Sequence, residues 1–467
     1  MIQLDRLSVT YPGRTTPALH NVSLTLSAGE SVCIMGANGS GKSTLALVLA
    51  GVLRPSSGQV LFTEDGPAGA GIVFQKPENQ MVAALVEKEL AFGLENQALL
   101  QAVMHAEIEK IAASFDLQSL LQSTTSRLSG GEQQRVALAS VMITSPNLLM
   151  LDEPDSFLDA ESRTLLDTAL KGIRARQPEL IEVRVTQDIS VARACSRLIL
   201  LDGGEVIAND SPEIILNQSD LLRKCRLIVE GASIDPAIPA EQELSELKTT
   251  TLQPDKLIVR DLAFEYGPGR PVLRDLSFSL NCGEVLGVAG PTGSGKTSLG
   301  LLLAGILEPQ SGTIIWARGE EPMVGGPFAT MALQQPERQF FLPTCAQEIA
   351  FGPANNGHAL RASDIDSLLD LVGLPPAAFR DRDPLTLSVG EQRRLACAVV
   401  VALDKPFIIF DEPTAGLDSE GVARFVSLIR RIKPTHGLVV ISHDHDLLTR
   451  ISNRVLVCGQ VPSPDRL

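Results

Sequence analysis

The sequence is poor in aromatic and in basic residues. Phenylalanine, tryptophan and tyrosine make up 4% of the 467 residues, so platforms on which nucleic-acid bases stack are not expected. Lysine and arginine number 40 against 55 aspartates and glutamates, which gives a net charge of −15. Because nucleic-acid backbones are held mainly by clustered Lys and Arg, this balance argues against a nucleic-acid partner.

Paired cysteines and long apolar runs are also missing. The seven cysteines include no Cys-x-x-Cys pair, so neither a zinc site nor a disulfide framework is expected, and a reducing cytosol fits best. No apolar run approaches the roughly 20 residues that a membrane helix needs. The segment Met1–Arg6 lacks a basic stretch followed by an apolar one, so no signal peptide is expected. Any role at a membrane would therefore be exercised from the cytoplasm through a partner.

What the sequence does contain is a repeat. A chain of 467 residues is too long for one ordinary core, and a Gly-rich segment occurs twice, at residues 36–43 and 290–297. The apolar content of 44% indicates well-filled α/β cores. We therefore expect two α/β domains, over residues 1–216 and 256–467, joined by a connector at 217–255 that is partly extended at its prolines.

Each Gly-rich segment follows a strand-like run (31–35 and 285–289) and precedes a helix-forming one, which is the setting of a phosphate-binding loop. Glycines let backbone N–H groups turn toward an anion, and the helix dipole and a lysine add positive charge. A chance Gly-rich turn is the alternative, and two copies in the same setting argue against it. The residues expected at the phosphates are Gly36, Asn38, Gly39, Ser40, Gly41, Lys42, Ser43 and Thr44 in the first copy, and Gly290, Thr292, Gly293, Ser294, Gly295, Lys296, Thr297 and Ser298 in the second.

The only two tyrosines, Tyr11 and Tyr266, stand at matched positions before the two loops. A ring there could stack on an adenine, an interaction of roughly 1–3 kcal/mol by analogy with base stacking. A tyrosine that covers a sheet edge is the alternative, which the matched positions weaken.

Two further polar motifs recur after the loops. Gln75 and Gln334 each follow an apolar strand and precede a proline, where the amide could reach a magnesium ion or its water. Later, each copy has a Leu-Ser-x-Gly-Glu-Gln segment whose serine is placed to cap a helix, giving a second anion-binding helix N-terminus unless it is only a cap. The residues of these segments are Ser129, Gly130, Gly131 and Glu132, and Ser388, Val389, Gly390 and Glu391.

An apolar run that is typical of a buried parallel strand ends in Asp152-Glu153 and again in Asp411-Glu412. The C-terminal ends of strands are where an open α/β sheet binds its ligands. We expect the aspartates, with the Ser43 and Thr297 hydroxyls, to hold magnesium, and the glutamates to polarise the attacking water. Helix capping by the two acids is the alternative.

One more strand ends in Gln187 in the first copy and in His443 in the second. A histidine there could bridge a γ-phosphate and the catalytic glutamate, because its ring donates hydrogen bonds and can carry charge. A lone histidine would ordinarily be a surface or core residue, but here the following aspartate matches in both copies.

The order of these motifs resembles that of two ATP-binding-cassette ATPase domains fused in tandem, over nearly all of the chain outside the connector. The resemblance implies P-loop NTPase domains, each with a mixed or parallel sheet flanked by helices, an antiparallel β subdomain and a helical subdomain. It also implies ATP and Mg²⁺ as ligands. The two halves would pair head to tail, with each ATP between one half's phosphate loop and the other half's Leu-Ser-x-Gly-Glu-Gln segment.

The segments around Gln75 and Gln334, and those ending in Ala-Phe-Gly at Gly93 and Gly352, are similar to the ATPase subunits of energy-coupling factor importers. Such importers take up vitamins, their precursors, or nickel and cobalt ions. This resemblance implies a hydrophobic transmembrane coupling subunit and a substrate-binding membrane subunit as partners, and a place at the cytoplasmic face of the membrane.

The two copies differ from the family pattern at Gln187, which replaces a histidine, and at Val389, which replaces a glycine. Head-to-tail pairing would bring both changes to the Lys42 site, where valine restricts φ and crowds the phosphate and glutamine cannot become cationic. We therefore expect Glu412 and His443 to carry most of the turnover, while the site of Glu153 and Gln187 hydrolyses slowly. The alternative functions are a soluble tandem cassette protein that acts on ribosomes or DNA, and the ATPase of an exporter.

Overall fold

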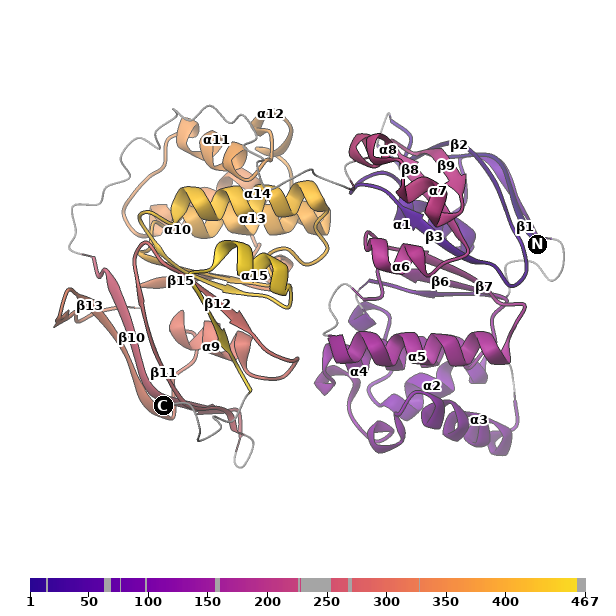
Figure 1. Ribbon diagram of the computed structural model, residues 1–467, viewed down its shortest axis with the longest axis horizontal. Helices are drawn as coiled ribbons and strands as arrows, with labels where there is room; N and C mark the ends of the chain where they lie inside the picture. The colour runs from indigo at the N-terminus through magenta and orange to yellow at the C-terminus, as the bar shows by residue number, and fades with distance from the viewer. Residues whose placement is uncertain are drawn as a thin grey trace. The chain divides into compact units, whose positions relative to one another are not determined.

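The computed structural model describes residues 1–13, 16–62, 69–75, 77–96, 99–155, 160–225, 227, 253–267, 271–326 and 328–459. The chain forms two compact units, residues 1–229 and 230–467 (Figure 1). Among the described residues, none of the helices is long and apolar enough to cross a bilayer.

The described residues of the first unit form two sheets. The strand order of the smaller, antiparallel sheet is β2-β1-β4, and that of the larger sheet is β5-β6-β7-β3-β8-β9. All neighbours in the larger sheet are parallel except β8 and β9. The strands are β1 (Ile2–Val9), β2 (Leu19–Leu26), β3 (Ser31–Met35), β4 (Ser57–Phe62), β5 (Ala70–Val73), β6 (Leu148–Asp152), β7 (Ile181–Val185), β8 (Arg197–Asp202) and β9 (Glu205–Asp210).

The helices of the first unit cover both faces of the larger sheet, and α2, α3 and α4 pack on one another as a helical subdomain. They are α1 (Lys42–Leu49), α2 (Val86–Glu95), α3 (Gln101–Ser114), α4 (Gly130–Met142), α5 (Ala160–Arg176), α6 (Ile189–Arg193), α7 (Pro212–Leu216) and α8 (Ser219–Lys224). Helix α8 falls in the range expected for the connector and packs against this unit through Leu222. Residues 228–252 of the expected connector lie outside the described residues.

The second unit repeats this plan with a four-stranded sheet, β11-β10-β13-β14, and a parallel five-stranded sheet, β15-β16-β17-β12-β18. The strands are β10 (Lys256–Glu265), β11 (Pro271–Asn281), β12 (Val285–Ala289), β13 (Ser311–Arg318), β14 (Glu321–Pro322), β15 (Ala329–Ala332), β16 (Phe407–Asp411), β17 (Gly437–Ile441) and β18 (Arg454–Val457). The helices are α9 (Lys296–Leu303), α10 (Cys345–Asn355), α11 (Ala362–Leu371), α12 (Pro376–Phe379), α13 (Val389–Ala402), α14 (Ser419–Ile432) and α15 (His445–Ile451).

The strand before each Gly-rich loop faces two cores because successive side chains of a strand point to opposite faces. In β12, Leu286 and Val288 pack with α9 and the antiparallel sheet, whereas Val285 and Ala289 pack with the helices on the other face. Figure 1 shows α9 and α13 on opposite sides of the five-stranded sheet that contains β12. The predicted fold, with an antiparallel β subdomain and a helical subdomain in each half, is confirmed.

Candidate functional site

Each Gly-rich loop leads from a parallel strand, β3 or β12, into a helix. Gly41 and Gly295 precede α1 and α9 with φ values of 101° and 90°, in the left-handed region that favours glycine. A β-carbon on Gly41 would come within 2.5 Å of the Ala18 carbonyl oxygen, so space as well as conformation requires glycine there. The chain therefore turns tightly enough to expose its N–H groups at the start of the helix.

The lysine of each loop folds back and donates hydrogen bonds to the loop that carries it. Lys42 Nζ donates to the carbonyl oxygens of Gly36 and Ala37 at 2.8 and 2.9 Å, and Lys296 Nζ makes the same two bonds in its loop at 2.8 and 2.9 Å. Among the described residues, the buried hydroxyls of Ser40 and Ser294 have no hydrogen-bond partner. A positive charge, a helix N-terminus and an unsatisfied buried hydroxyl make each loop fit a phosphate group.

The strand-end aspartates lie against the loop hydroxyls, as expected. Thr297 Oγ1 donates to Asp411 Oδ2 at 2.8 Å, and Asp152 is hydrogen-bonded to Ser43. Oδ1 of Asp411 is buried without a hydrogen-bond partner among the described residues. Carboxylate and hydroxyl oxygens are the donors that Mg²⁺ prefers, so this group of atoms fits that ion.

The neighbouring glutamates have an unusual backbone conformation, which sequence reasoning missed. Glu153 and Glu412 both have φ of 47°, a region that non-glycine residues rarely adopt, and each backbone N–H bonds across to the next strand at 2.9 Å. Such conformations persist where surrounding structure fixes them, often at functional sites. The equal φ values indicate that the same backbone conformation orients both carboxylates.

The contacts of the two glutamates differ. Glu153 Oε2 accepts a 2.7 Å hydrogen bond from Gln75 Nε2. Glu412 instead lies against His443, whose Nε2 is 3.4 Å from Oε1 and whose backbone N–H reaches Oε2 at 3.4 Å. Gln187, at the position of that histidine in the first unit, donates from Nε2 to Asn38 Oδ1 in the phosphate loop at 2.9 Å.

The acids of the second unit are the more deeply buried. Asp411 and Glu412 are 2% and 7% exposed, whereas Asp152 and Glu153 are half-buried. Burial, followed by the charge of Asp411, raises the pKa of Glu412 to about 7, and burial raises the pKa of Asp411 to about 6. A glutamate with a pKa near 7 is suited to general-base catalysis near neutral pH.

The serines of the Leu-Ser-x-Gly-Glu-Gln segments cap α4 and α13 as expected, and each forms a capping box with the glutamate three residues later. The expectation that Val389 is unfavourable because valine restricts φ is wrong. Gly130 at the equivalent position has no left-handed φ, and a β-carbon there would meet nothing within 4 Å. Valine therefore fits the backbone of its own unit, and its methyl groups can affect only a ligand that approaches from outside.

The tyrosines and glutamines also lie near the loops. The hydroxyl of Tyr11 is 3.2 Å from Thr44 Oγ1 in α1, and that of Tyr266 is 3.1 Å from Ser298 Oγ in α9. Gln75 and Gln334 each follow by two residues the strand that borders the one bearing the Asp-Glu pair. Each unit thus brings together its loop, its tyrosine and its strand-end acids.

A phosphate loop beside a strand-end Asp-Glu pair defines a P-loop ATPase. The ABC transporter family pattern matches residues 19–156 and 273–415, once in each unit. The chain belongs to the ABC transporter family, and it is an ATPase that binds ATP.

Relatives match almost the whole chain. It is 32% identical to BL0043 of Bifidobacterium longum, named as a candidate ABC transporter ATP-binding protein, over 97% of this chain and 64% of that protein, so it spans under two thirds of that relative's length. It is 29% identical to YkoD of Bacillus subtilis, named as a candidate HMP/thiamine import ATP-binding protein, over 98% of this chain and 89% of that protein. A solved complex of the archaeal ribosome recycling factor aABCE1 with the ribosomal stalk protein aP1 matches with a TM-score of 0.62 and 22% identity, over 97% of this chain and 87% of that one, which shows the fold alone.

Proposed function

We propose that this protein is the ATP-hydrolysing energy-coupling subunit of an importer of the energy-coupling factor type, which takes up a vitamin, a vitamin precursor, or nickel or cobalt ions. The observation that carries the proposal is the presence of two sets of cassette motifs in one chain that is 29% identical, over 98% of its length, to a candidate HMP/thiamine import protein. The similarity of the Gln75 and Gln334 segments to those of importer ATPases supports the same class.

The two halves would pair head to tail within the chain. The phosphate loop of Lys42 would then face the segment of Ser388, and the loop of Lys296 would face that of Ser129. ATP held between them would close the halves, and hydrolysis would release them. Pairing gives each capped helix N-terminus an anion to bind, which a half by itself does not supply.

Magnesium would be held by Ser43, Gln75 and Asp152 in one site and by Thr297, Gln334 and Asp411 in the other. When bound, the ion would neutralise charge on the β- and γ-phosphates. Glu412 would take a proton from the attacking water, and His443 would hold that carboxylate and reach the γ-phosphate. The two tyrosines and the remaining predicted residues of the phosphate loops and of the Leu-Ser-x-Gly-Glu-Gln segments would bind the nucleotide.

The Lys42 site would turn over more slowly than the Lys296 site. Gln187 contacts the loop at Asn38, whereas His443 lies against the catalytic carboxylate, and only histidine can carry a proton near pH 7. Val389 would add methyl groups beside the phosphate of this same site. Comparison of Glu412→Gln with Glu153→Gln tests the asymmetry: we expect the first to remove most of the ATPase rate, and equal losses would refute it.

The membrane subunits would dock on exposed apolar side chains in the segments that follow the two glutamines in the chain. Phe341 and Phe351 are 64% and 42% exposed and their rings meet edge to face at 4.9 Å, while Val82 and Phe92 are exposed in the first unit. Aromatic side chains of this kind anchor protein interfaces. The protein would then sit at the cytoplasmic face of the membrane.

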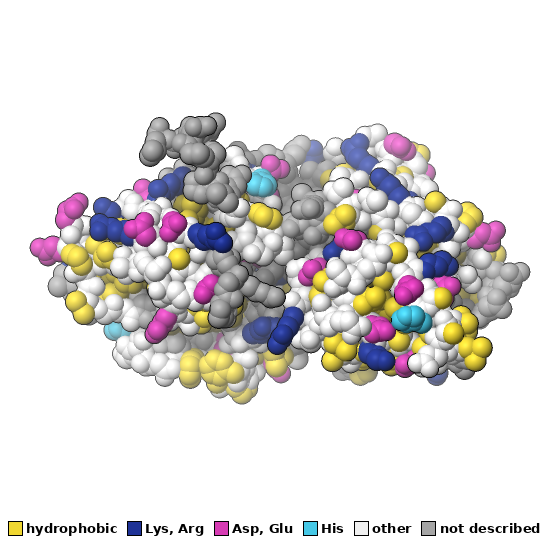
Figure 2. All heavy atoms as spheres, turned by 90° about the horizontal axis from the view of Figure 1, so that it is seen from below, with side chains coloured by type: hydrophobic (Ala, Val, Ile, Leu, Met, Phe, Trp, Pro, Cys, Tyr) yellow, Lys and Arg dark blue, Asp and Glu magenta, His cyan; other side chains and the backbone are white. Residues whose placement is uncertain are grey.

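The test is co-purification from detergent-solubilised membranes. We expect a hydrophobic transmembrane subunit and a substrate-binding membrane subunit to elute with the wild type and to be lost from a Phe341→Ser, Phe351→Ser double variant. Leu385→Ser, at a side chain 61% exposed in the same unit, is the matched control and should retain them. Recovery of ribosomes or DNA in place of membrane proteins would overturn the proposal. Among the described residues coloured in Figure 2, basic and acidic side chains are interspersed on each unit, which argues against binding of nucleic acid.

A further inference from the structure

Two cysteines of the first unit lie on one face of its larger sheet. Along β3, Val32 and Ile34 point to the core beneath α1, whereas Cys33 and Met35 point to the other face. Cys195 belongs to the same cluster as Cys33, from the segment between α6 and β8. Cys33 and Cys195 interact with each other, while the Cys195 thiol donates to the Val191 carbonyl oxygen at 3.5 Å.

The second unit shows independently that these two positions face each other. Val32 pairs with Arg197 and Leu286 with Arg454, so Gly287 is the counterpart of Cys33 and Ser452 that of Cys195. A β-carbon added to Gly287 would lie 2.6 Å from Ser452 Oγ. The two positions therefore face each other in the second unit, and Cys33 and Cys195 share one buried cluster in the first.

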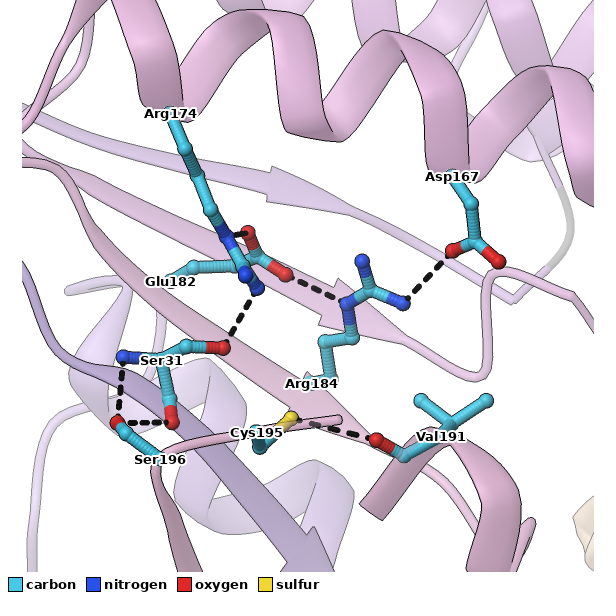
Figure 3. A network of polar contacts seen from close by, with 8 residues as sticks. All are labelled: Ser31, Asp167, Arg174, Glu182, Arg184, Val191, Cys195 and Ser196. Carbon is cyan, nitrogen blue, oxygen red and sulfur yellow. Dashed lines mark hydrogen bonds and ion pairs between the residues drawn. The ribbon is translucent and has the colours of Figure 1, made fainter. Parts of the chain in front are cut away.

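A buried cation lies beside the cysteines. Arg184 is the register partner of Cys33 on β7, and its side chain is 11% exposed. Figure 3 shows the Arg184 guanidinium directed toward Glu182 and Asp167, and the Cys195 sulfur directed toward the Val191 carbonyl oxygen. A guanidinium in this position favours the thiolate over the thiol.

The two sulfurs have different acidities. The interaction with Cys33, opposed by burial but aided by Ser31 and by the charge of Arg184, lowers the pKa of Cys195 to about 7. The contact with Cys195 and burial raise the pKa of Cys33. One nucleophilic thiolate beside one protonated thiol is the arrangement that an attacking and a resolving cysteine require.

We propose that Cys33 and Cys195 form a reactive dithiol that a hydroperoxide oxidises reversibly to a disulfide. The Cys195 thiolate attacks the terminal peroxide oxygen, so that an S–O bond forms and the O–O bond breaks. The other oxygen takes a proton from solvent and leaves as an alcohol, or as water when the oxidant is hydrogen peroxide. The Cys33 sulfur then attacks the sulfenic sulfur. An S–S bond forms, the S–O bond breaks, and hydroxide leaves as water with the Cys33 proton. The two thiols supply the two electrons that reduce the peroxide.

The bond would join two segments that lead to the first candidate ATP site. Cys33 precedes the first loop glycine, Gly36, by three residues, and Cys195 lies just beyond the helix that follows Gln187. The second unit has glycine and serine at the equivalent positions, so the dithiol belongs to the first unit alone. Its chemistry does not depend on a role in transport.

The test uses the full-length protein, reduced and then treated with hydrogen peroxide, followed by thiol counting in denaturant and peptide mass spectrometry. We expect the count to fall from seven by two, with a cross-linked peptide that joins Cys33 to Cys195. Dithiothreitol should restore all seven thiols.

Cys195→Ser should abolish the cross-link and is expected to fold, because serine occupies the equivalent position 452. Cys282→Ser, at a half-buried cysteine of the second unit, is the matched control and should keep it. A count that stays at seven while peroxide oxidises free glutathione in the same tube would overturn the proposal. So would Cys195 sulfinic acid without a cross-linked peptide, or a disulfide between other cysteines.

Discussion

Gln75 donates a 2.7 Å hydrogen bond to the carboxylate of Glu153, whereas in the described part of the second unit no such bond joins Gln334 to Glu412. Glu412 is contacted instead by His443, through both its ring and its backbone. The two catalytic candidates thus have the same backbone conformation and different partners. In the first unit the partner is a neutral amide, and in the second it is a ring that can carry a proton.

This difference predicts unequal effects of substitution at the two strand ends. His443→Gln should lower the steady-state ATPase rate by about 10-fold or more, because the carboxylate loses a partner that can donate and accept protons. Gln187→Ala, its matched control, should change the rate by less than about 2-fold. Phosphate release at saturating ATP measures both. Similar losses in the two variants would contradict the assignment of most turnover to the second unit.

Val389→Gly should change activity without a large change in stability. The structure leaves open space at the equivalent Gly130, so we expect the substitution to change only the helix propensity of this position. The lower propensity of glycine should reduce the free energy of unfolding by about 1 kcal/mol or less. In a Glu412→Gln background, which isolates the Lys42 site, the residual ATPase rate should rise. Urea unfolding provides the stability measurement, and Gly130→Val in the same background is the control that should not raise the rate.

Tyr266→Ala should weaken ATP binding by about 10-fold, the loss expected for one aromatic stacking partner. Tyr266→Phe keeps the ring, which packs edge to face on Phe264 at 4.9 Å, and loses only the hydroxyl that lies near Ser298, so its affinity should stay within about 2-fold. Equilibrium binding of a fluorescent ATP analogue distinguishes the two. If Phe and Ala weaken binding equally, the hydroxyl rather than the ring is responsible.

The parts of the site that follow from local sequence could be predicted, and the long-range contacts could not. The loops, the strand-end acids and the serine caps each lie within a few consecutive residues, where spacing alone indicates the chemistry. The bond between Gln75 and Glu153 joins residues 78 positions apart, and the left-handed backbone of Glu153 has no compositional signal because glutamate rarely adopts it.

Strand β7 is a second example, in which the sequence pattern does not predict that a strand face is buried. Its sequence, Ile-Glu-Val-Arg-Val, alternates apolar and charged residues, which is typical of a strand with one solvated face. In the structure α5 covers that face, and Glu182 is 1% exposed between Arg174 and Arg184 (Figure 3). The apolar counterpart in the second unit, Gly-Leu-Val-Val-Ile, was the only hint that this face is buried.

The buried carboxylate predicts a pH-dependent contribution to the stability of the first unit. Burial opposes ionisation of Glu182, but the hydrogen bond from Arg174 and the charge of Arg184 outweigh it, so its pKa is lowered in the folded state. A lowered folded-state pKa means that the stabilisation is fully present above the ordinary pKa of 4.5 and is lost as pH falls below 4.5 through the folded-state value.

Glu182→Gln should therefore destabilise the first unit by about 3 kcal/mol at pH 7, because it leaves two arginines without their shared counter-charge. The difference from wild type should shrink as pH falls below 4.5. Hydrogen–deuterium exchange of β7 is the measurement, since the single tryptophan, Trp316, lies in the second unit and does not report on the first. Asp167→Asn, at a partner of Arg184 that is 53% exposed, is the control and should cost less than about 1 kcal/mol. A Glu182→Gln effect that stays constant between pH 7 and pH 4 would mean that packing, rather than the charge of Glu182, holds the network together.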